Sequence, residues 1–197
     1  GDKKDIKNWR PISLLCTDYK ILAKALANRM RCVLESVVHT DQTCSVPGRT
    51  IHANLFLTRD IIRYTNHKRY KGYILTVDQE KAFDRVDRAF LFKILKKMNF
   101  GDRFLKWLDV FYSDPKVALY VNGHIGETFI TTRGLRQGCP LSAILYVLFI
   151  ESLGQYIRAD KLIHGMKLPG TTEETKLAQY ADDLTFIISQ CTDYKHL

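Results

Sequence analysis

The sequence predicts an α+β fold, and two observations carry that prediction. Residues 1–72 place apolar side chains at helical spacing among many basic residues. After residue 72, short β-rich runs alternate with longer helical stretches, and runs that resemble sheet strands lie far apart in the chain. We therefore expect a basic, mostly helical part at 1–72 and a part that mixes helices and strands at 73–197.

The first part is expected to contain one short strand and two helices. Residues 11–15 predict the strand, and Thr17 or Asp18 then caps a long helix. A second helix is expected to begin after Thr50 and to be closed by Gly72. The apolar stripe of the long helix is Leu22, Leu26, Met30, Val33 or Leu34, and Val37.

The second part opens with the apolar run Tyr-Ile-Leu-Thr-Val at 73–77, which predicts a buried central strand ending on Asp78. Asn122-Gly123 lies between two β-rich runs and is a typical hairpin turn. The other expected elements are helices at about 87–98, 102–112 and 141–157, a loop at 134–138, and a strand-turn-strand around Asp182-Asp183.

Composition and charge limit the class of protein. No apolar run reaches the roughly 18 residues that cross a membrane. Five cysteines without CxxC spacing predict reduced thiols in an intracellular protein, and no structural zinc. The net charge is +9; residues 1–72 hold 14 Lys and Arg against 6 Asp and Glu, whereas residues 73–197 hold 16 against 15. A concentrated basic excess is expected where nucleic acid or polyphosphate binds, although a solvated basic surface explains the charge equally well.

Three aspartates stand at unusual positions. Asp78 ends an apolar strand, where an ionised carboxylate is costly to bury unless it is paired or metal-bound. Asp182 and Asp183 are adjacent at the tip of a predicted hairpin, where a tight turn normally uses Asn-Gly or Asp-Gly. Each alone is more often a capping or surface-turn residue. Together on neighbouring strands, they can hold two Mg²⁺ ions roughly 3.5–4 Å apart, which indicates metal-assisted phosphoryl or nucleotidyl transfer.

The chain contains five notable segments, in this order: 8–15 (NWRPISLL), 46–50 (VPGRT) with Asn54, 78–84 (DQEKAFD), 133–142 (RGLRQGCPLS) and 180–183 (YADD). Together they resemble the motifs of reverse transcriptases. Three are similar to the central motifs of that family, and two are similar to finger motifs of its non-LTR (LINE-type) retrotransposon branch. The resemblance implies a right-hand polymerase with fingers at 1–72, a palm at 73–197 built of an antiparallel sheet packed on helices, a small finger-side insertion in that palm, and no thumb.

The resemblance implies a metal site. Asp78 and Asp182 would hold both catalytic metals, Asp183 would complete the carboxylate set, and the backbone carbonyl of Gln79 would be a further ligand. The implied cofactors are two Mg²⁺ ions, for which Mn²⁺ can substitute. One ion would lower the pKa of the primer 3′-hydroxyl and the other would bind the triphosphate, so no protein nucleophile is required.

The resemblance also implies a nucleotide-binding set. Phe83 matches the aromatic steric gate that excludes a 2′-hydroxyl; without its motif, an ordinary core aromatic would be the better interpretation. Gln137 and Gly138 match the loop that lies against the incoming nucleotide and the template. Arg10 matches the finger arginine that stacks near the base and touches the α-phosphate.

Contacts to template and primer are implied less specifically. Arg49 can contact template phosphate or can be a surface arginine at a helix entry. Arg136 can bind backbone phosphate or be a surface charge, and Tyr180 can lie against the primer end or simply pack in the sheet. The candidates for the triphosphate-binding lysine are Lys3, Lys4 and Lys7.

The implied function is RNA-directed DNA synthesis, with an RNA template, a DNA primer and dNTPs as partners and no membrane. The start at Gly1, without an initiator methionine, is typical of an internal piece. The other domains of a longer polyprotein would include a thumb and an endonuclease, and without its thumb the fragment should bind primer–template weakly. The resemblance further implies an intracellular ribonucleoprotein, nuclear and cytoplasmic.

Three alternatives compete with this interpretation. An RNA-dependent RNA polymerase is disfavoured by Phe83 and by Ala181, where viral RNA polymerases usually have glycine. A group II intron maturase is disfavoured by the Trp-Arg-Pro-Ile-Ser run at 9–13. A non-catalytic nucleic-acid-binding protein, derived from a decayed copy, is disfavoured because the three aspartates, the gate and Gln137 are all present.

Overall fold

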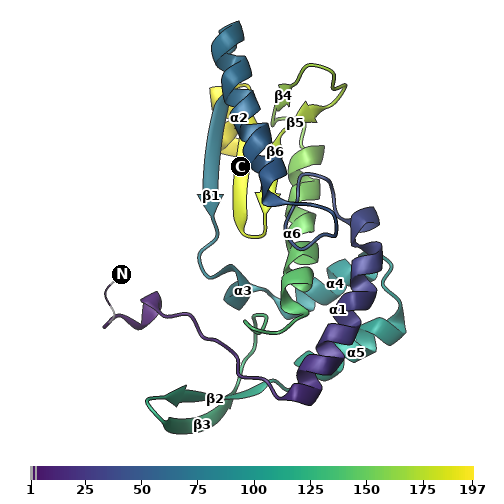
Figure 1. The fold of residues 1–197 in the computed structure, drawn as a ribbon, viewed down its shortest axis with the longest axis vertical. Coiled ribbons are helices and arrows are strands. Elements are labelled where there is room, and N and C mark those ends of the chain that lie inside the picture. Colours follow the sequence, from purple (N-terminus) through teal and green to yellow (C-terminus); the bar gives the residue numbers. More distant parts are fainter. Residues whose placement is uncertain (1, 3) are drawn as a thin grey trace.

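A three-stranded antiparallel sheet lies at the centre of the structure. The computed structural model describes residues 2 and 4–197, apart from the side chain of Tyr194. The strands are β1 (Tyr73–Asp78), β6 (Leu177–Tyr180) and β7 (Asp183–Ile188), in the order β1-β7-β6. Helices α2 (Ile51–Lys68) and α6 (Ser142–Ala159) both run alongside the sheet (Figure 1). The predicted α+β class is thereby confirmed.

The two faces of the sheet bury different side chains. Phe186 and Ile188 join the main core, to which α6 contributes most of its length. On the other face, Ile187 packs with Ile61 of α2 and with Met166. Because successive residues of a strand point to opposite faces, this division fixes the register of the hairpin that carries Asp182 and Asp183.

The N-terminal helices follow the prediction with corrections at their ends. α1 (Thr17–Val37) begins one residue after its N-cap Cys16, and no side chain caps it. α2 begins after Thr50 as predicted, but Arg69 in the left-handed conformation closes it rather than Gly72. The strand predicted at 11–15 is wrong, because these residues have no strand partner. The buried stripe of α1 is Ala23, Leu26, Ala27, Met30 and Leu34.

The expectation of a buried central strand at 73–77 is also wrong. Among the described residues, β1 pairs with β7 alone and forms the edge of the sheet, and all six of its residues are exposed. The apolar, β-rich run does form a strand, as its composition predicts. An apolar run alone does not reveal on which side of a strand a neighbour lies.

The remaining helices and the hairpin agree closely with the prediction. Asp87 caps α4 (Arg88–Lys97), where its Oδ1 accepts a 2.8 Å hydrogen bond from the Phe90 amide. α5 spans Asp102–Tyr112, and the hairpin joins β2 (Lys116–Val121) to β3 (His124–Ile130). The short elements are η1 (Ile6–Asn8), α3 (Ala82–Arg85), β4 (Met166–Lys167), β5 (Glu174–Thr175) and η2 (Cys191–His196).

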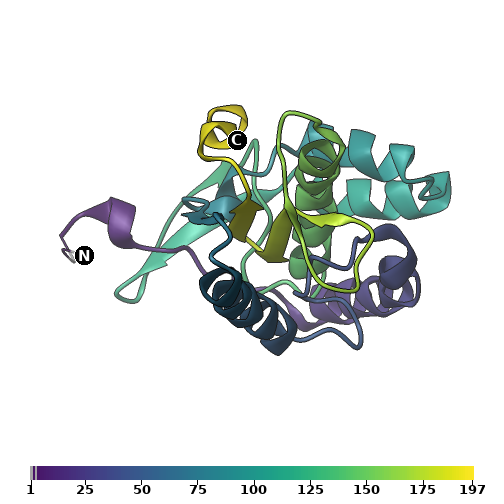
Figure 2. The same ribbon diagram turned by 90° about the horizontal axis from the view of Figure 1, so that it is seen from above.

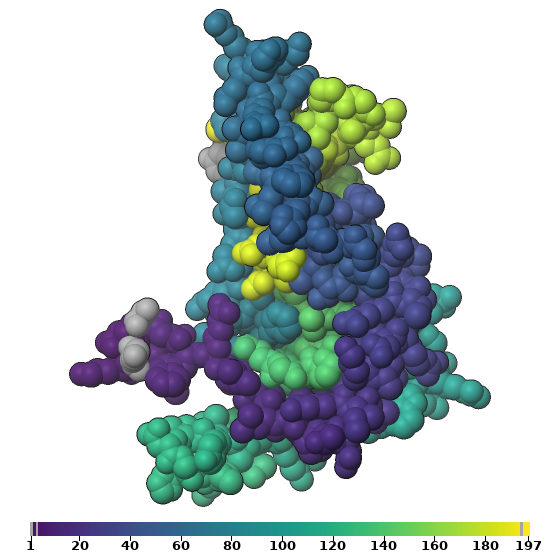
Figure 3. All heavy atoms as spheres, viewed as in Figure 1, coloured from purple at the N-terminus to yellow at the C-terminus, as the bar shows by residue number. Residues whose placement is uncertain are grey.

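Two parts of the chain project from the body. The N-terminal segment with η1 and the β2–β3 hairpin both extend away from the packed helices (Figure 2), and Figure 3 shows them as separate projections on the same side. Every residue of β3 is exposed. Among the described residues, no helix combines the length and the apolar character needed to cross a membrane.

Candidate active site

The three predicted aspartates meet at one end of the sheet. Asp78 ends β1 and Asp183 begins β7, and the Cα atoms of these two residues are register partners. Tyr180 pairs with Asp183 in the β6–β7 ladder, which leaves Ala181 and Asp182 as a two-residue turn. Asp78 and Asp183 are exposed and Asp182 is half-buried. Hydrogen bonding of the sheet therefore gathers carboxylates that are about a hundred residues apart in the chain.

The chemistry of this donor set suits a divalent cation. Within residues 2 and 4–197, none of the three aspartates forms an ion pair, although like charges on neighbouring strand ends repel. Over the same residues, no three acidic, histidine or cysteine side chains come together as a self-sufficient metal cage. Magnesium usually binds through one or two carboxylates and keeps waters and substrate phosphates. The strand-end carboxylates fit that open mode of binding.

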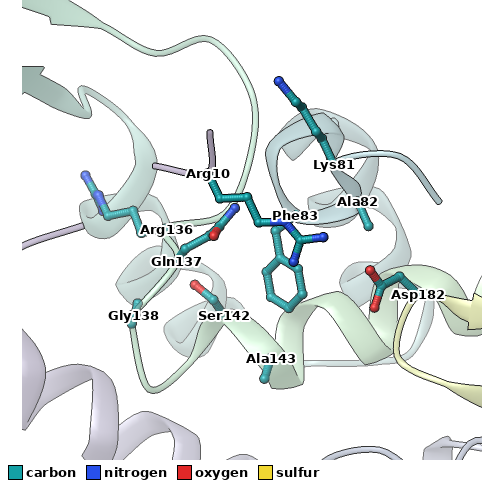
Figure 4. Close-up of a pocket in the computed structure, with 11 residues that line it drawn as sticks. Arg10, Lys81, Ala82, Phe83, Arg136, Gln137, Gly138, Ser142, Ala143 and Asp182 are labelled. Atoms are coloured by element: carbon teal, nitrogen blue, oxygen red, sulfur yellow. The ribbon is translucent and has the colours of Figure 1, made fainter. Parts of the chain in front are cut away.

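A cavity of about 350 Å³ lies beside Asp182. Its walls come from the N-terminal segment, the residues around α3, the loop before α6 and the β6–β7 turn. Figure 4 shows Arg10 extending toward the Phe83 ring and the side of the cavity that Asp182 occupies. The predicted site residues in its lining are Arg10, Phe83, Arg136, Gln137, Gly138 and Asp182. The predicted residues outside the lining are Asp78, Gln79, Arg49, Tyr180 and Asp183.

An aromatic ring of α6 holds Phe83 in place. The Phe83 ring stacks on Tyr146 with centroids 4.8 Å apart and planes inclined by 17°. Tyr146 is fully buried, and its hydroxyl donates a 2.8 Å hydrogen bond to Oε1 of Gln79. Burial raises the pKa of Tyr146, and the carboxylates of Asp182 and Asp78 raise it further. Tyr146 is therefore a neutral hydrogen-bond donor between the predicted gate and the strand end.

Sequence reasoning did not single out Tyr146. An aromatic residue in a strongly apolar helix gives no sign of a polar partner 67 positions earlier in the chain. The spacing from Gln137 and Gly138 onto the first turns of α6 could have placed Tyr146 near the site, since α6 begins four residues after Gly138.

Arg88 ties down the start of the loop before α6. Its guanidinium donates to the carbonyl oxygens of Thr131, Arg133 and Gly134 at 2.6, 2.8 and 2.9 Å. Such charge-assisted bonds are stronger than those between neutral groups. The loop is thus anchored to the N-terminal turn of α4.

Gln137 is fixed at the other end of that loop. Its side-chain amide donates a 3.0 Å hydrogen bond to Oδ1 of Asp84. Its backbone carbonyl accepts a hydrogen bond from the Ser13 amide at 2.9 Å. At Gly134, φ is +89° and a Cβ atom would lie 2.9 Å from the Asp84 carbonyl oxygen. Glycine is therefore required there for the loop to approach α3.

The Arg49 side chain is committed to the C-terminal end of α1 and the turn after it. Its Nη2 donates to the carbonyl of Val38 at 2.9 Å, and its Nη1 donates to the carbonyl of Gln42 at 3.0 Å. Further bonds reach the carbonyls of His39 and Glu35. This geometry favours a structural arginine over the predicted contact with template phosphate.

Arg136 combines a place in the cavity wall with structural contacts. Its Nη1 donates to the Tyr19 hydroxyl at 2.8 Å and to the Phe111 carbonyl at 2.7 Å. The guanidinium also lies over the rings of Tyr19 and Tyr112, 5.1 and 5.5 Å from their centroids. Burial raises the pKa of Tyr112 to about 12, so that ring is neutral beneath the charge.

The remaining predicted residues lie at the periphery. Tyr180 is half-buried at the end of β6, beside Asp183 in the ladder. Lys4 and Lys7 are exposed in the N-terminal projection. Lys3, the third candidate for the triphosphate lysine, lies outside the described residues.

Comparison with known proteins gives a consistent result. The family model for "Reverse transcriptase (RNA-dependent DNA polymerase)" matches residues 2–197. An uncharacterised 149 kDa protein of transposon TX1 from Xenopus laevis is 42% identical over 193 residues, which is 98% of this chain and 15% of that protein. The Pol polyprotein of the retrotransposable element R2DM from Drosophila melanogaster is 28% identical over 90% of this chain and 16% of its own length. The chain thus spans less than a fifth of either relative.

Solved structures agree on the fold. Apo telomerase from Candida tropicalis, truncated from its C-terminal domain, matches with a TM-score of 0.57 at 13% identity, over 90% of this chain and 36% of that one. Telomerase from Candida albicans matches with a TM-score of 0.52 at 11% identity, over 89% of this chain and 31% of that one. At such low identity the likeness bears on the fold alone, and it supports the expected fingers and palm architecture.

Proposed function

Because the chain belongs to the reverse transcriptase family, we propose that it forms the fingers and palm of an RNA-directed DNA polymerase from a non-LTR retrotransposon. Members of this family use divalent metal ions and copy an RNA template from a nucleic-acid primer. In this proposal, residues 1–72 are the fingers and residues 73–197 the palm. The reaction adds dNTPs to the 3′-hydroxyl of a DNA primer and releases pyrophosphate.

The cavity beside Asp182 is the observation that carries this proposal. It brings Arg10, Phe83, Gln137 and Gly138 against the turn that bears a carboxylate. A planar guanidinium suits the α-phosphate, and the Phe83 ring, held by stacking on Tyr146, would exclude a 2′-hydroxyl. The amide of Gln137, fixed by Asp84, can orient a base or sugar edge.

The strand-end carboxylates would hold the metal ions. Asp78, Asp182 and Asp183 supply hard oxygen ligands, and the backbone carbonyl of Gln79 is a further candidate; two Mg²⁺ ions, with Mn²⁺ able to substitute, fit this set. When bound, such ions lower the pKa of the primer hydroxyl and neutralise the leaving pyrophosphate. The chain itself positions these carboxylates through the β1–β7 register and presents the sugar gate next to them.

The biological setting follows from the relatives and is part of the proposal. The TX1 and R2 proteins are several times longer than this chain, so we place it in a polyprotein with a thumb and an endonuclease. The basic N-terminal part would contact the RNA template and the primer. The expected setting is an intracellular ribonucleoprotein that reaches the nucleus.

Primer extension on an RNA template tests the proposal. The full-length polypeptide that contains residues 1–197 is assayed with Mg²⁺ and dNTPs, beside Asp182→Asn and beside Asp109→Asn as a matched exposed carboxylate on α5. We expect synthesis by the wild type and by Asp109→Asn, and a loss of about 100-fold or more for Asp182→Asn because charge stabilisation at the reacting atoms is removed.

Two outcomes of the primer-extension assay would contradict the proposal. If no variant extends the primer, yet all bind primer–template equally in a salt-dependent way, the protein is a non-catalytic nucleic-acid-binding protein. If rNTPs are incorporated as readily as dNTPs, the RNA polymerase alternative takes its place.

A further inference from the structure

Residues 39–54 form hydrogen bonds with β6 of the β6–β7 hairpin, on the edge of β6 that faces away from β7. The Gln179 amide donates to the Asp41 carbonyl at 2.8 Å, and the Thr43 amide donates to the Gln179 carbonyl at 3.0 Å. Nδ2 of Asn54 adds a third bond, at 2.7 Å, to the same carbonyl. The outer edge of β6 is therefore covered by a segment that lies more than a hundred residues earlier in the chain.

Gln42 is the residue through which this segment reaches the turn. Its side chain is fully buried, with an exposed fraction of 0%. Its Oε1 accepts from the amides of Cys44 at 2.9 Å and Ala181 at 3.1 Å, and its Nε2 donates to Oε1 of Gln179 at 3.2 Å. Ala181 is the residue directly before Asp182 in the two-residue turn.

Two features of the Ala181-Asp182 turn are unfavourable without a stabilising contact. Ala181 adopts φ +53°, in the left-handed region that is unfavourable for a residue with a Cβ atom. The next two residues, Asp182 and Asp183, carry like charges. The β6–β7 ladder closes this turn, and the hydrogen bond from the Ala181 amide to the Gln42 side chain adds a constraint on its geometry from outside the hairpin.

Close packing limits the freedom of this link. Gln179 is 1% exposed, and a Cβ atom at Gly154 of α6 would lie 2.6 Å from its Nε2. The two glutamine side chains therefore have no room to rearrange separately.

We propose that Gln42 is a positioning residue, which sets the orientation of Asp182 by holding the Ala181 amide through its side-chain carbonyl. This inference rests on the proposed function, because it assigns Asp182 to the metal site. It predicts that loss of this hydrogen bond lowers the affinity for metal at the turn more than it lowers the stability of the fold or the affinity for nucleic acid.

Gln42→Met tests the inference in the full-length polypeptide, because methionine fills a similar volume without an acceptor. Thr43→Val is the matched control, since it removes a hydrogen bond to the Gln179 carbonyl but leaves the Ala181 amide bonded. We expect Gln42→Met to lower Mn²⁺ affinity, measured by electron paramagnetic resonance, and kcat for dTTP incorporation by about fivefold each, the equivalent of one hydrogen bond. Affinity for primer–template should change less than about twofold.

Ala181→Gly supplies the second test. Glycine adopts positive φ without strain, so the turn should depend less on its anchor. Added to Gln42→Met, this substitution should restore Mn²⁺ affinity to within about twofold of the wild type. Hydrogen exchange of the Ala181 amide should speed up in Gln42→Met and not in Thr43→Val.

The inference fails if Gln42→Met leaves Mn²⁺ affinity unchanged, or if Ala181→Gly and Gln42→Met lower it additively. It also fails if Mn²⁺ affinity, primer–template binding and thermal stability all fall together in Gln42→Met and in Thr43→Val. Mn²⁺ binding is measured without DNA synthesis. An inactive wild type would therefore contradict the proposed function, whereas the Mn²⁺ affinities of the variants would still test the role of Gln42.

Discussion

Removal of the Arg158 guanidinium should destabilise this chain more at pH 8 than at pH 5. Arg158 lies on α6 and pairs with the carboxylates of Asp41 and Glu151. Its Nη1 is 2.6 Å from Oδ2 of Asp41, and its Nη2 bonds to Oε1 of Glu151. The exposed fractions of the Arg158, Asp41 and Glu151 side chains are 20%, 9% and 2%. Arg158→Leu would leave two carboxylates with little access to water and without this counter-charge.

The expected loss of stability is large for one substitution. Removing one partner of a buried ion pair typically costs about 3–5 kcal/mol, because the other charge is left unpaired. Here one cation serves two carboxylates, so the upper part of that range applies at pH 8. A domain with a total stability of about 5–15 kcal/mol would lose a substantial fraction of it.

The pH dependence follows from Glu151. Burial raises its pKa, and Arg158 opposes that increase. A raised native pKa means that the folded chain binds the proton more tightly than the unfolded chain. The resulting stability is complete below the ordinary carboxyl pKa of about 4.3 and is lost as the pH rises through the raised value. Without Arg158 the pKa rises further, so the loss extends to higher pH.

Urea denaturation followed by circular dichroism at pH 5 and pH 8 checks this reasoning. The difference between the two pH values should grow by about 1.4 kcal/mol for each unit by which the substitution raises the Glu151 pKa. Arg103→Leu, at an exposed arginine of α5, is the control, and Glu151→Gln in the Arg158→Leu background should remove most of the pH effect. Equal destabilisation at both pH values would refute the argument.

Three further predictions concern the site and its supports. Phe83→Val should raise rNTP incorporation relative to dNTP by about tenfold or more, because widening an apolar pocket changes discrimination by about 1–3 kcal/mol; competition between the two nucleotides measures it. Tyr146→Phe should slow single-nucleotide incorporation about fivefold, through loss of the bond to Gln79, and should keep the preference for dNTP because the stacked ring remains. Arg49→Gln should lower the free energy of unfolding by about 2 kcal/mol, because a glutamine amide cannot bond the same carbonyls as a planar fork; the salt slope of primer–template binding should stay unchanged.

Controls and contrary outcomes are specific to each variant. Phe90→Val changes an aromatic residue away from the cavity. An equal rise in rNTP incorporation by this variant would contradict the role of Phe83 as the steric gate. Tyr156→Phe, at an exposed tyrosine of α6, should not slow incorporation. Arg63→Gln, at an exposed arginine of α2, should leave stability unchanged, and a lower salt slope for Arg49→Gln would show that Arg49 contacts nucleic-acid phosphate.

Local signals in the sequence predicted much of the fold. The Asn122-Gly123 turn and the Asp87 cap act over a few residues, and the elements that they define appear as expected. The approach of Asp78 to Asp183 was also predicted, since a strand end and a hairpin tip with the same chemistry point to one metal site. These patterns depend on neighbours in the chain and on residue type.

Long-range partners could not be predicted in the same way. The hydrogen bonds from the Tyr146 hydroxyl to Gln79 and from the Ala181 amide to Gln42 join residues 67 and 139 positions apart. The sequence around Gln42 and Gln79 does not distinguish them from glutamines exposed on a surface. Arg49 stands in a matching motif, yet its donors are used by backbone carbonyls at the end of α1. Polar side chains are assigned by the three-dimensional packing, which a pattern of residue types does not contain.

The exposed edge of β1 has a consequence for handling this protein. Within the part of the chain that the structure describes, residues 73–78 have no strand partner on the side away from β7, and five of the six side chains on this strand carry no charge. An exposed, largely apolar edge of this kind can pair with another copy of itself and seed aggregation. Solubility of any version of this chain should therefore depend on whether that edge is covered, and a single lysine in place of Thr76 is expected to keep preparations monodisperse at higher concentration.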